Sequence, residues 1–234
     1  MTDQYIPTRC INEERLPDDG FDIVELFKFY LIKEQNDPAN NIAKPRAFYP
    51  SSFGNTCRRA LYYHRIGAEH QKRWTTEDLL LFKAGDAYHT ALQDLIKDHG
   101  GVLIEDRIRI DDIDTNGYVD SVFKTEEWII EIKSIAESSY NALTKPKEDH
   151  KKQAHLYMWA HDIPRAQLVY VNRNTGALRK FKVLFSNETW GEIVEEVNEV
   201  DAAVEANEPP PYASNEYTCR KCKFFLKGCD RPAS

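Results

Sequence analysis

The chain has 234 residues, of which 41% are hydrophobic and 12% aromatic, so it can bury a core and is not a chain disordered throughout. This length suits one α/β domain with appendages. No apolar run approaches membrane-spanning length, and the polar start Met-Thr-Asp-Gln is not that of a signal peptide. We therefore expect a cytoplasmic protein without a membrane partner.

The formal net charge of −7 argues against tight non-specific binding to nucleic acid, but the charge is unevenly spread. Residues 183–219 contain nine acids and no Lys or Arg. The remainder has 31 basic and 29 acidic residues, so the acidic excess lies mostly in one segment. A phosphate-binding face elsewhere on the molecule is not excluded.

The N-terminal quarter predicts two helices. Residues 1–20 are polar and predict an extended lead-in, where Cys10 is expected to be a free thiol. Residues 21–34 predict an amphipathic helix and are followed by a Pro- and Asn-rich loop over 35–50. Residues 51–66 predict a short helix capped by Ser51 or Ser52.

Residues 76–98 predict the longest helix. Its expected core stripe consists of Leu81, Ala84, Tyr88, Ala91 and Leu95. Gly85 and His89 lie one turn apart on an adjoining face, where the glycine would leave room beside the imidazole for a metal ion or a phosphate. The alternative is an ordinary packed or solvated histidine.

Residues 102–110 predict a strand, and residues 118–123 and 128–132 predict two more strands joined by a polar turn. Because side chains alternate along a strand, Glu131 and Lys133 share one face, and Trp128, Ile130 and Ile132 are expected to enter the core from the other. Asp120, on the preceding strand, can lie opposite Glu131.

Two carboxylates and one ammonium then converge, which suits Mg²⁺ or Mn²⁺. The alternative is a hairpin with a surface Glu–Lys pair. Glu105 is either a further carboxylate on the metal side or a solvent-facing side chain.

The following segments predict a helix over 148–161, strands over 166–173 and 177–185, and an acidic helix over 187–206. The two strands flank an Asn172-to-Gly176 turn, which is typical of a hairpin. In the first helix Gln153 and Tyr157 share a face. The acidic helix is expected to bury Trp190, Ile193, Val194, Val197 and Val200.

Three cysteines in the tail, Cys219, Cys222 and Cys229, indicate a metal site, but three thiolates do not close a tetrahedral one. Cys57 is the natural fourth ligand. Four thiolates suit either zinc or a [4Fe–4S] cluster, and the spacing does not decide between them.

The segments Gly117-Tyr-Val-Asp120 and Glu131-Ile-Lys133 resemble the core of the PD-(D/E)XK nucleases. Val119 replaces the leading Pro, as is usual in the RecB-like branch of that superfamily. Gly85-x-x-x-His89 before this core and Gln153-x-x-x-Tyr157 after it resemble further motifs of the branch. One cysteine before the core and three after it resemble its iron–sulfur members, such as the AddB-type and CRISPR adaptation nucleases.

The resemblance implies an α/β fold with a mixed central β-sheet flanked by helices, a restriction-endonuclease-like core. Residues 51–230 would form the nuclease domain, after an N-terminal lead-in and helix at 1–50. Cys57 and the 219–229 tail would form an iron–sulfur clasp that joins the N- and C-terminal regions, with a [4Fe–4S] cluster or, alternatively, zinc.

The implied activity is that of a Mg²⁺- or Mn²⁺-dependent deoxyribonuclease, an exonuclease acting on single-stranded DNA or DNA ends. The implied catalytic residues are Asp120, Glu131 and Lys133. The implied metal ligands are His89, Asp120, Glu131 and the backbone carbonyl of Ile132. Gln153, Tyr157, Arg58 and Arg59 would contact DNA, the two arginines within a basic patch around the cysteines.

Two other classes of protein fit the same residues. One is a non-catalytic DNA-binding helper subunit of a recombination or CRISPR adaptation complex. The other is a zinc-stapled interaction protein whose acidic helix docks a basic partner. The polarity of digestion, the strand preference and the pathway, whether recombination, phage DNA metabolism or CRISPR adaptation, stay open.

Overall fold

The computed structural model describes residues 23–35, 47–54, 57–68 and 74–212, together with Cys219, Cys222, Phe224 and Cys229. The predicted lead-in and Cys10 lie outside these residues. The helices and strands are α1 (Ile23–Gln35), η3 (Pro50–Ser52), α2 (Arg58–Arg65), α3 (Thr76–Ile96), β1 (Val102–Ile110), η4 (Asp111–Ile113), β2 (Thr115–Phe123), β3 (Trp128–Ile135), α4 (Glu137–Asn141), α5 (Glu148–His161), β4 (Arg165–Asn172), β5 (Leu178–Leu184) and α6 (Asn187–Ala206).

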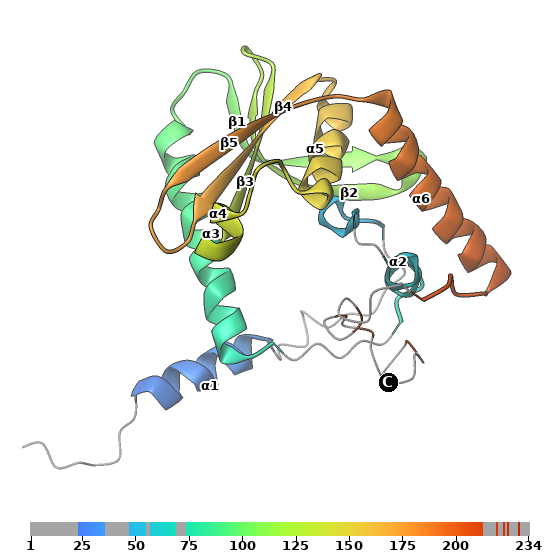
Figure 1. Cartoon of the computed structure of the whole chain (residues 1–234), viewed down its shortest axis with the longest axis horizontal. Coiled ribbons are helices and arrows are strands. Elements are labelled where there is room, and N and C mark those ends of the chain that lie inside the picture. The colour runs from blue at the N-terminus through green and yellow to red at the C-terminus, as the bar shows by residue number, and fades with distance from the viewer. Residues whose placement is uncertain are drawn as a thin grey trace, which may run out of the picture.

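The five strands form one sheet in the order β1-β2-β3-β4-β5. The neighbours β1–β2, β2–β3 and β4–β5 are antiparallel, whereas β3 and β4 are parallel. A parallel pair needs a crossover connection, and the segment carrying α4 and α5 supplies it. Figure 1 shows the sheet with α3, α5 and α6 around it. The predicted α/β fold, with a mixed sheet flanked by helices, is confirmed.

Strand β3 is buried on both faces, unlike the one-sided strand that its sequence predicted. Ile129 is 0% exposed and Ile132 is 2% exposed, although they point to opposite sides, while Ile130 is only partly buried. The reason is that helices cover both sides: α3 packs on β2 and β3, and α5 packs on β1, β3 and β4. Acidic side chains on β3 are therefore placed inside the protein.

Helices α5 and α6 pack together beside the sheet through aromatic and aliphatic side chains. Trp159 stacks on Trp190 with ring centroids 4.3 Å apart. Ile193, Val197 and Val200 are buried, as the pattern of the acidic helix predicted. The N-cap of α6 is Ser186, whose side chain accepts a hydrogen bond from the backbone of Thr189.

Charged residues join α6 to the rest of the chain. On the other side of α6, Arg58 and Arg65 of α2 form ion pairs with Glu196, Glu199 and Asp201. Much of the acidic charge of α6 is therefore neutralised within the molecule. These ion pairs weaken the alternative hypothesis in which the acidic helix binds a basic partner protein.

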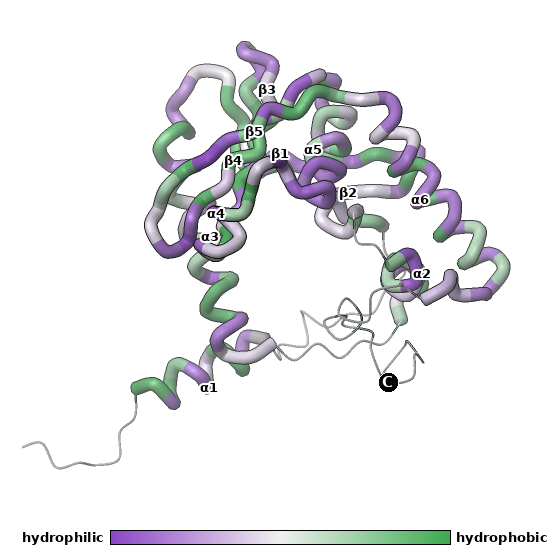
Figure 2. The backbone as a smooth tube through the Cα atoms, in the orientation of Figure 1, coloured by the Kyte–Doolittle hydropathy of each residue, from purple (hydrophilic) through white to green (hydrophobic). Residues whose placement is uncertain are grey.

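The core stripe predicted for α3 is wrong. Leu81 is 46% exposed and Leu95 is 81% exposed, and Gln93 is the one buried residue among those of this helix. The first half of α3 extends away from the sheet and meets α1, which carries hydrophobic residues along its length (Figures 1 and 2). The inward side of α3 instead carries His89 and Gln93.

The segment before α2 also belongs to the core. Phe48 is 0% exposed and forms a parallel bridge with Thr115 at the start of β2. Pro50 lies so close to β2 that a Cβ atom on Gly117 would come within 2.7 Å of its ring. None of the described helices is long and apolar enough to cross a membrane.

Candidate active site

The candidate site lies where β2 and β3 separate. These strands pair over only three residue pairs, the last being Ser121 with Ile130. Beyond that point β2 stays paired with β1, and β3 stays paired with β4. Asp120 occupies the point of divergence, where its Oδ2 accepts a hydrogen bond of 2.6 Å from the backbone N–H of Ile132. The carboxylate thus takes the place of a strand carbonyl.

The other oxygen of Asp120 faces α3. Its Oδ1 lies 3.2 Å from Nδ1 of His89, and this hydrogen bond is the first cause of a raised His89 pKa. His89, Glu105 and Asp120 each offer one ligand atom, and these atoms all lie within 4.8 Å of one another. The structure therefore brings Glu105 to the predicted His89–Asp120 pair, although its side chain is also exposed, so both alternatives for Glu105 stay predictions.

Gln93 holds this group together and was missed by sequence reasoning. Its Nε2 donates to Oε1 of Glu105 at 2.7 Å and to the backbone carbonyl of Asp120 at 3.0 Å. Glu105 adopts a left-handed φ of +50°, which is strained for a residue with a side chain. The position of Gln93, one turn after His89 on the same helix face, is the signal that could have identified it.

Glu131 and Lys133 complete the set on β3. Lys133 Nζ lies 2.6 Å from Oε1 of Glu131, whereas Oε2 of Glu131 is buried without a hydrogen-bond partner among the described residues. Burial, and then the charge of Asp120, raise the pKa of Glu131 to about 8. Two neighbouring buried carboxylates are costly to ionise without a cation between them, so this oxygen and its neighbours fit a divalent metal ion.

Gln153 and Tyr157 approach the site from α5. Gln153 Nε2 donates to the hydroxyl of Tyr157 at 2.8 Å, and both side chains are buried. Burial and then the charge of Glu131 raise the pKa of Tyr157. The helix that carries both residues packs on β3, the strand of Glu131, and their contact with DNA stays a prediction.

Gly85 lies close to β3, and its predicted role of leaving room beside His89 stays a prediction. A Cβ atom at this position would lie 3.1 Å from Oγ of Ser134. The absence of a side chain therefore allows α3 to approach β3, and the close neighbour is a strand residue. That approach in turn brings His89 up to Asp120.

The four cysteines of the predicted clasp lie in or against the hydrophobic core. Cys57 and Cys219 are buried in it, and Cys222 and Cys229 pack against it. Burial raises the pKa of Cys222, and the other three cysteines raise it further. These four cysteines form no disulfide. Phe224 is buried and packs on Tyr63, which favours packing over base stacking for this ring.

Arg58 and Arg59 already have partners within the protein. Arg58 binds Glu196 and Glu199 at 2.6 Å each. Arg59 donates to the backbone carbonyl of Pro210 at 2.9 Å and lies over the ring of Tyr212. Both arginines hold α2 against α6 and the segment after it. Their predicted contact with DNA stays a prediction, without support from these contacts.

The sequence matches no protein-family model and no curated protein sequence. Solved structures do share the fold. The crystal structure of SSO0001 is 18% identical with a TM-score of 0.58, over 92% of this chain and 99% of that one. The alkaline exonuclease LHK-Exo from Laribacter hongkongensis, also solved in complex with dAMP, is 16% identical with a TM-score of 0.51, over 69% of this chain and 89% of that one.

A phage-related exonuclease from Haemophilus somnus 129PT is 14% identical with a TM-score of 0.51, over 64% of this chain and 80% of that one. At these identities the likeness establishes the fold, which this chain shares with exonuclease structures. What the chain does has to be argued from its own site.

Proposed function

We propose that this chain is a Mg²⁺- or Mn²⁺-dependent deoxyribonuclease that hydrolyses phosphodiester bonds. The observation that carries the proposal is the set of groups at the divergence of β2 and β3: Asp120 facing His89, and buried Glu131 beside Lys133. An exonuclease fold with these residue types at this point supports the activity. The dAMP complex of LHK-Exo favours DNA as the substrate class.

His89, Asp120, Glu131 and the backbone carbonyl of Ile132 would hold the metal ion, and Glu105 joins them on geometric grounds. The ion, when bound, stabilises charge on the phosphate and lowers the pKa of a coordinated water. Lys133, whose side chain is 22% exposed, places its ammonium beside Glu131. From there it orients the water or stabilises negative charge that develops on the phosphate.

The finer assignment is an exonuclease acting on single-stranded DNA or on DNA ends. The predicted contact of Gln153 and Tyr157 with the strand belongs to this proposal. The two side chains bind each other and are buried, which favours a role in packing α5 against the sheet. Protein partners in a recombination, phage or CRISPR adaptation complex are compatible with the proposal.

Cys57, Cys219, Cys222 and Cys229 are proposed to hold a [4Fe–4S] cluster, with zinc as the alternative. The proposal rests on the spacing of the cysteines and on their position in or against one hydrophobic core. A cluster there would join α2 to the C-terminal tail. The site lies apart from Asp120, so its role in this proposal is structural.

The function is tested by cleavage of end-labelled single-stranded and duplex DNA with Mg²⁺ or Mn²⁺. We expect the parent protein to shorten DNA and a chelator to stop it. Asp120→Asn and Lys133→Ala should each lower the rate at least about 100-fold, because each removes a charge needed at the reacting phosphate.

The matched control is Lys97→Ala, which removes an exposed lysine paired only with Asp94 on the surface. It should cleave at the parent rate, and circular dichroism should show that all three variants are folded. Cleavage by Asp120→Asn near the parent rate would refute the site assignment. Tight DNA binding by a parent protein that never cuts would support the helper-subunit alternative.

A further inference from the structure

His150, in the first turn of α5, has its imidazole fixed by a buried tyrosine. Nδ1 of His150 lies 2.9 Å from the hydroxyl of Tyr170, and the backbone N–H of Lys147 donates to the same hydroxyl at 3.1 Å. Tyr170 is 0% exposed, so its hydroxyl hydrogen needs an acceptor inside the protein, and Nδ1 is in place to accept it. The imidazole proton is then on Nε2.

This histidine lies next to the proposed catalytic lysine. In the parallel register of β3 and β4, Tyr170 is paired with Lys133, so their side chains are neighbours on one face of the sheet. Burial is the main cause that lowers the pKa of His150 to about 4. The charge of Asp149 raises this pKa, and the charges of Lys133 and Lys147 lower it. The ring is therefore neutral at ordinary pH. Lys133 also binds Glu131, so His150 is linked to the proposed site through Tyr170 and its strand neighbour Lys133.

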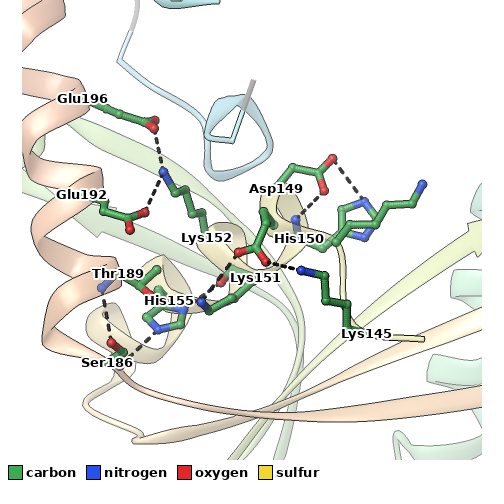
Figure 3. A network of polar contacts seen from close by, with 12 residues as sticks. Lys145, Asp149, His150, Lys151, Lys152, His155, Ser186, Thr189, Glu192 and Glu196 are labelled. Atoms are coloured by element: carbon green, nitrogen blue, oxygen red, sulfur yellow. Dashed lines mark hydrogen bonds and ion pairs between the residues drawn. The ribbon is translucent and has the colours of Figure 1, made fainter. Parts of the chain in front are cut away.

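The N–H of Nε2 is available to a ligand. Its neighbour Asp149 places Oδ2 at 3.7 Å, which is too long for a hydrogen bond, while Oδ1 of Asp149 accepts from the backbone of His150 at 2.9 Å. Figure 3 shows Asp149 and His150 side by side at the start of α5, with Lys145 and Lys151 nearby. The side chain of His150 keeps 15% of its surface exposed.

The start of α5 is held rigidly. Gly54, with φ +81°, follows η3 and lies so close to the helix that a Cβ atom would come within 2.3 Å of the Cα of Asp149. A fixed, neutral N–H donor, near lysines and at the N-terminus of a 14-residue helix, is a suitable contact for a phosphate oxygen.

We propose that His150 donates its Nε2–H to a DNA phosphate next to the one being hydrolysed, and that Tyr170 is the positioning residue that sets its tautomer and orientation. The inference rests on the proposed function, since it places this phosphate beside Lys133. The neighbouring phosphate, and not the scissile one, is the partner because the contacts among the described residues connect His150 to Glu131 only through Tyr170 and Lys133.

The test uses single-stranded DNA in which one phosphodiester at a time is replaced by an uncharged methylphosphonate. With the parent protein, we expect one non-scissile linkage whose replacement slows cleavage about 10- to 100-fold, the effect of losing a hydrogen bond to a charged group. His150→Ala should be slowed by a similar factor on unmodified DNA. The cleavage rate of His150→Ala should not fall further when that linkage is neutral. In Tyr170→Phe the neutral linkage should slow cleavage less than in the parent protein, but more than in His150→Ala.

Lys145→Ala is the matched control, because it removes an exposed charge close to α5 and leaves the imidazole in place. It should keep the full sensitivity to the neutral linkage. If His150→Ala cleaves unmodified DNA at the parent rate, or keeps the parent response to every linkage, the proposal is overturned.

The same oligonucleotides are also titrated for binding in Ca²⁺, a measurement that does not require cleavage. Loss of binding at one neutral linkage in the parent but not in His150→Ala supports the contact even if the protein proves not to cut DNA. Equal responses of the two proteins in this titration would reject the contact while leaving the nuclease proposal intact.

Discussion

At the scale of single residues, Asp120 links backbone geometry to chemistry. One oxygen replaces a missing strand partner for Ile132, and the other faces His89. A carboxylate fixed in this way cannot rotate away from the site without leaving a buried N–H unsatisfied, which costs about 1–3 kcal/mol. The site is therefore preorganised before a metal ion or DNA binds.

His155 shows how a buried histidine makes stability depend on pH. Its Nδ1 lies 2.8 Å from the carbonyl of Lys151, and its Nε2 accepts from the backbone of Ser186 at 3.2 Å, so the neutral ring joins α5 to the cap of α6 (Figure 3). Burial lowers its pKa. A second proton would need the nitrogen that already accepts from Ser186.

We therefore expect the contribution of His155 to stability to fall as the pH drops below about 6.5, where this histidine gains a proton in the unfolded chain but not in the fold. His150 and His161, whose pKa values are also lowered, act in the same direction. The raised pKa values of His89 and Glu131 act in the opposite direction. His155→Gln keeps one donor and one acceptor and should show a shallower loss between pH 7 and 5.5. Urea denaturation at several pH values measures this, and parallel curves for variant and parent would contradict it.

At the scale of elements, the packing of α2 and η3 against α6 and α5 closes the side of the molecule away from α3. Arg58 and Lys152 both bind Glu196, which is 4% exposed. A buried carboxylate with two cations is destabilised strongly when one of them is lost. This contact explains how Arg58, next to Cys57, stabilises the fold.

Arg58→Ala should lower the free energy of unfolding by about 1–3 kcal/mol, less than for a fully buried pair because Arg58 is one-third exposed and Lys152 still binds Glu196. Glu199→Ala removes only the exposed partner of the same arginine and should cost less than about 1 kcal/mol. Urea denaturation measures both free energies of unfolding. An equal decrease in the two variants would show that the burial of Glu196 adds nothing to the stabilising effect of Arg58.

Two glycines with similar backbone angles give a second contrast between elements. Gly54 and Gly176 have φ of +81° and +74°, but only Gly54 has a neighbour, the backbone of Asp149. Gly176→Ala should cost about 1 kcal/mol, the penalty of the left-handed conformation alone. Gly54→Ala should cost at least about 2 kcal/mol more, because η3 must move away from α5. Thermal unfolding of both variants measures the difference, and similar values would refute the close approach.

At the scale of the whole molecule, the C-terminal tail meets α2, where Phe224 packs on Tyr63. Cys57 and Cys219 are distant in sequence but belong to one hydrophobic core cluster. A metal cluster held by four thiolates contributes its binding free energy to folding. The proposed clasp would therefore stabilise the region around α2 more than the sheet.

Cys222→Ser should lose the cluster and lower the melting temperature by about 10 °C or more, equivalent to roughly 3 kcal/mol or more for a chain of this size. Cys10→Ser, outside the described residues, is the matched control and should leave both unchanged. The measurement is anaerobic purification with an absorption spectrum and metal assay, where we expect about four irons per chain. If the parent protein contains zinc and no iron, the four cysteines would still join α2 to the tail, but through a zinc ion and not through an iron–sulfur cluster.

The sequence by itself predicted most of the helices and strands and the order of the acidic and basic residues among them. The helix predicted over 51–66 is wrong in its bounds, because α2 begins at Arg58 with Cys57, and not Ser51 or Ser52, at its N-cap. The helix at 148–161 has the predicted bounds, and the predicted strands lie within a few residues of the observed ones. This works because periodicity, turns and caps are local signals. For the same reason His89, Asp120, Glu131 and Lys133 could be selected from their spacing and from a family resemblance.

Only the tertiary structure decided which groups meet. The end of pairing between β2 and β3, the arrival of Glu105 and Gln93 at Asp120, and the contact of His150 with Tyr170 each depend on segments from different elements. Arg58 binds Glu199, which lies 141 residues away. No local pattern encodes such a contact, because its free energy depends on burial and neighbours that exist only after the chain has packed.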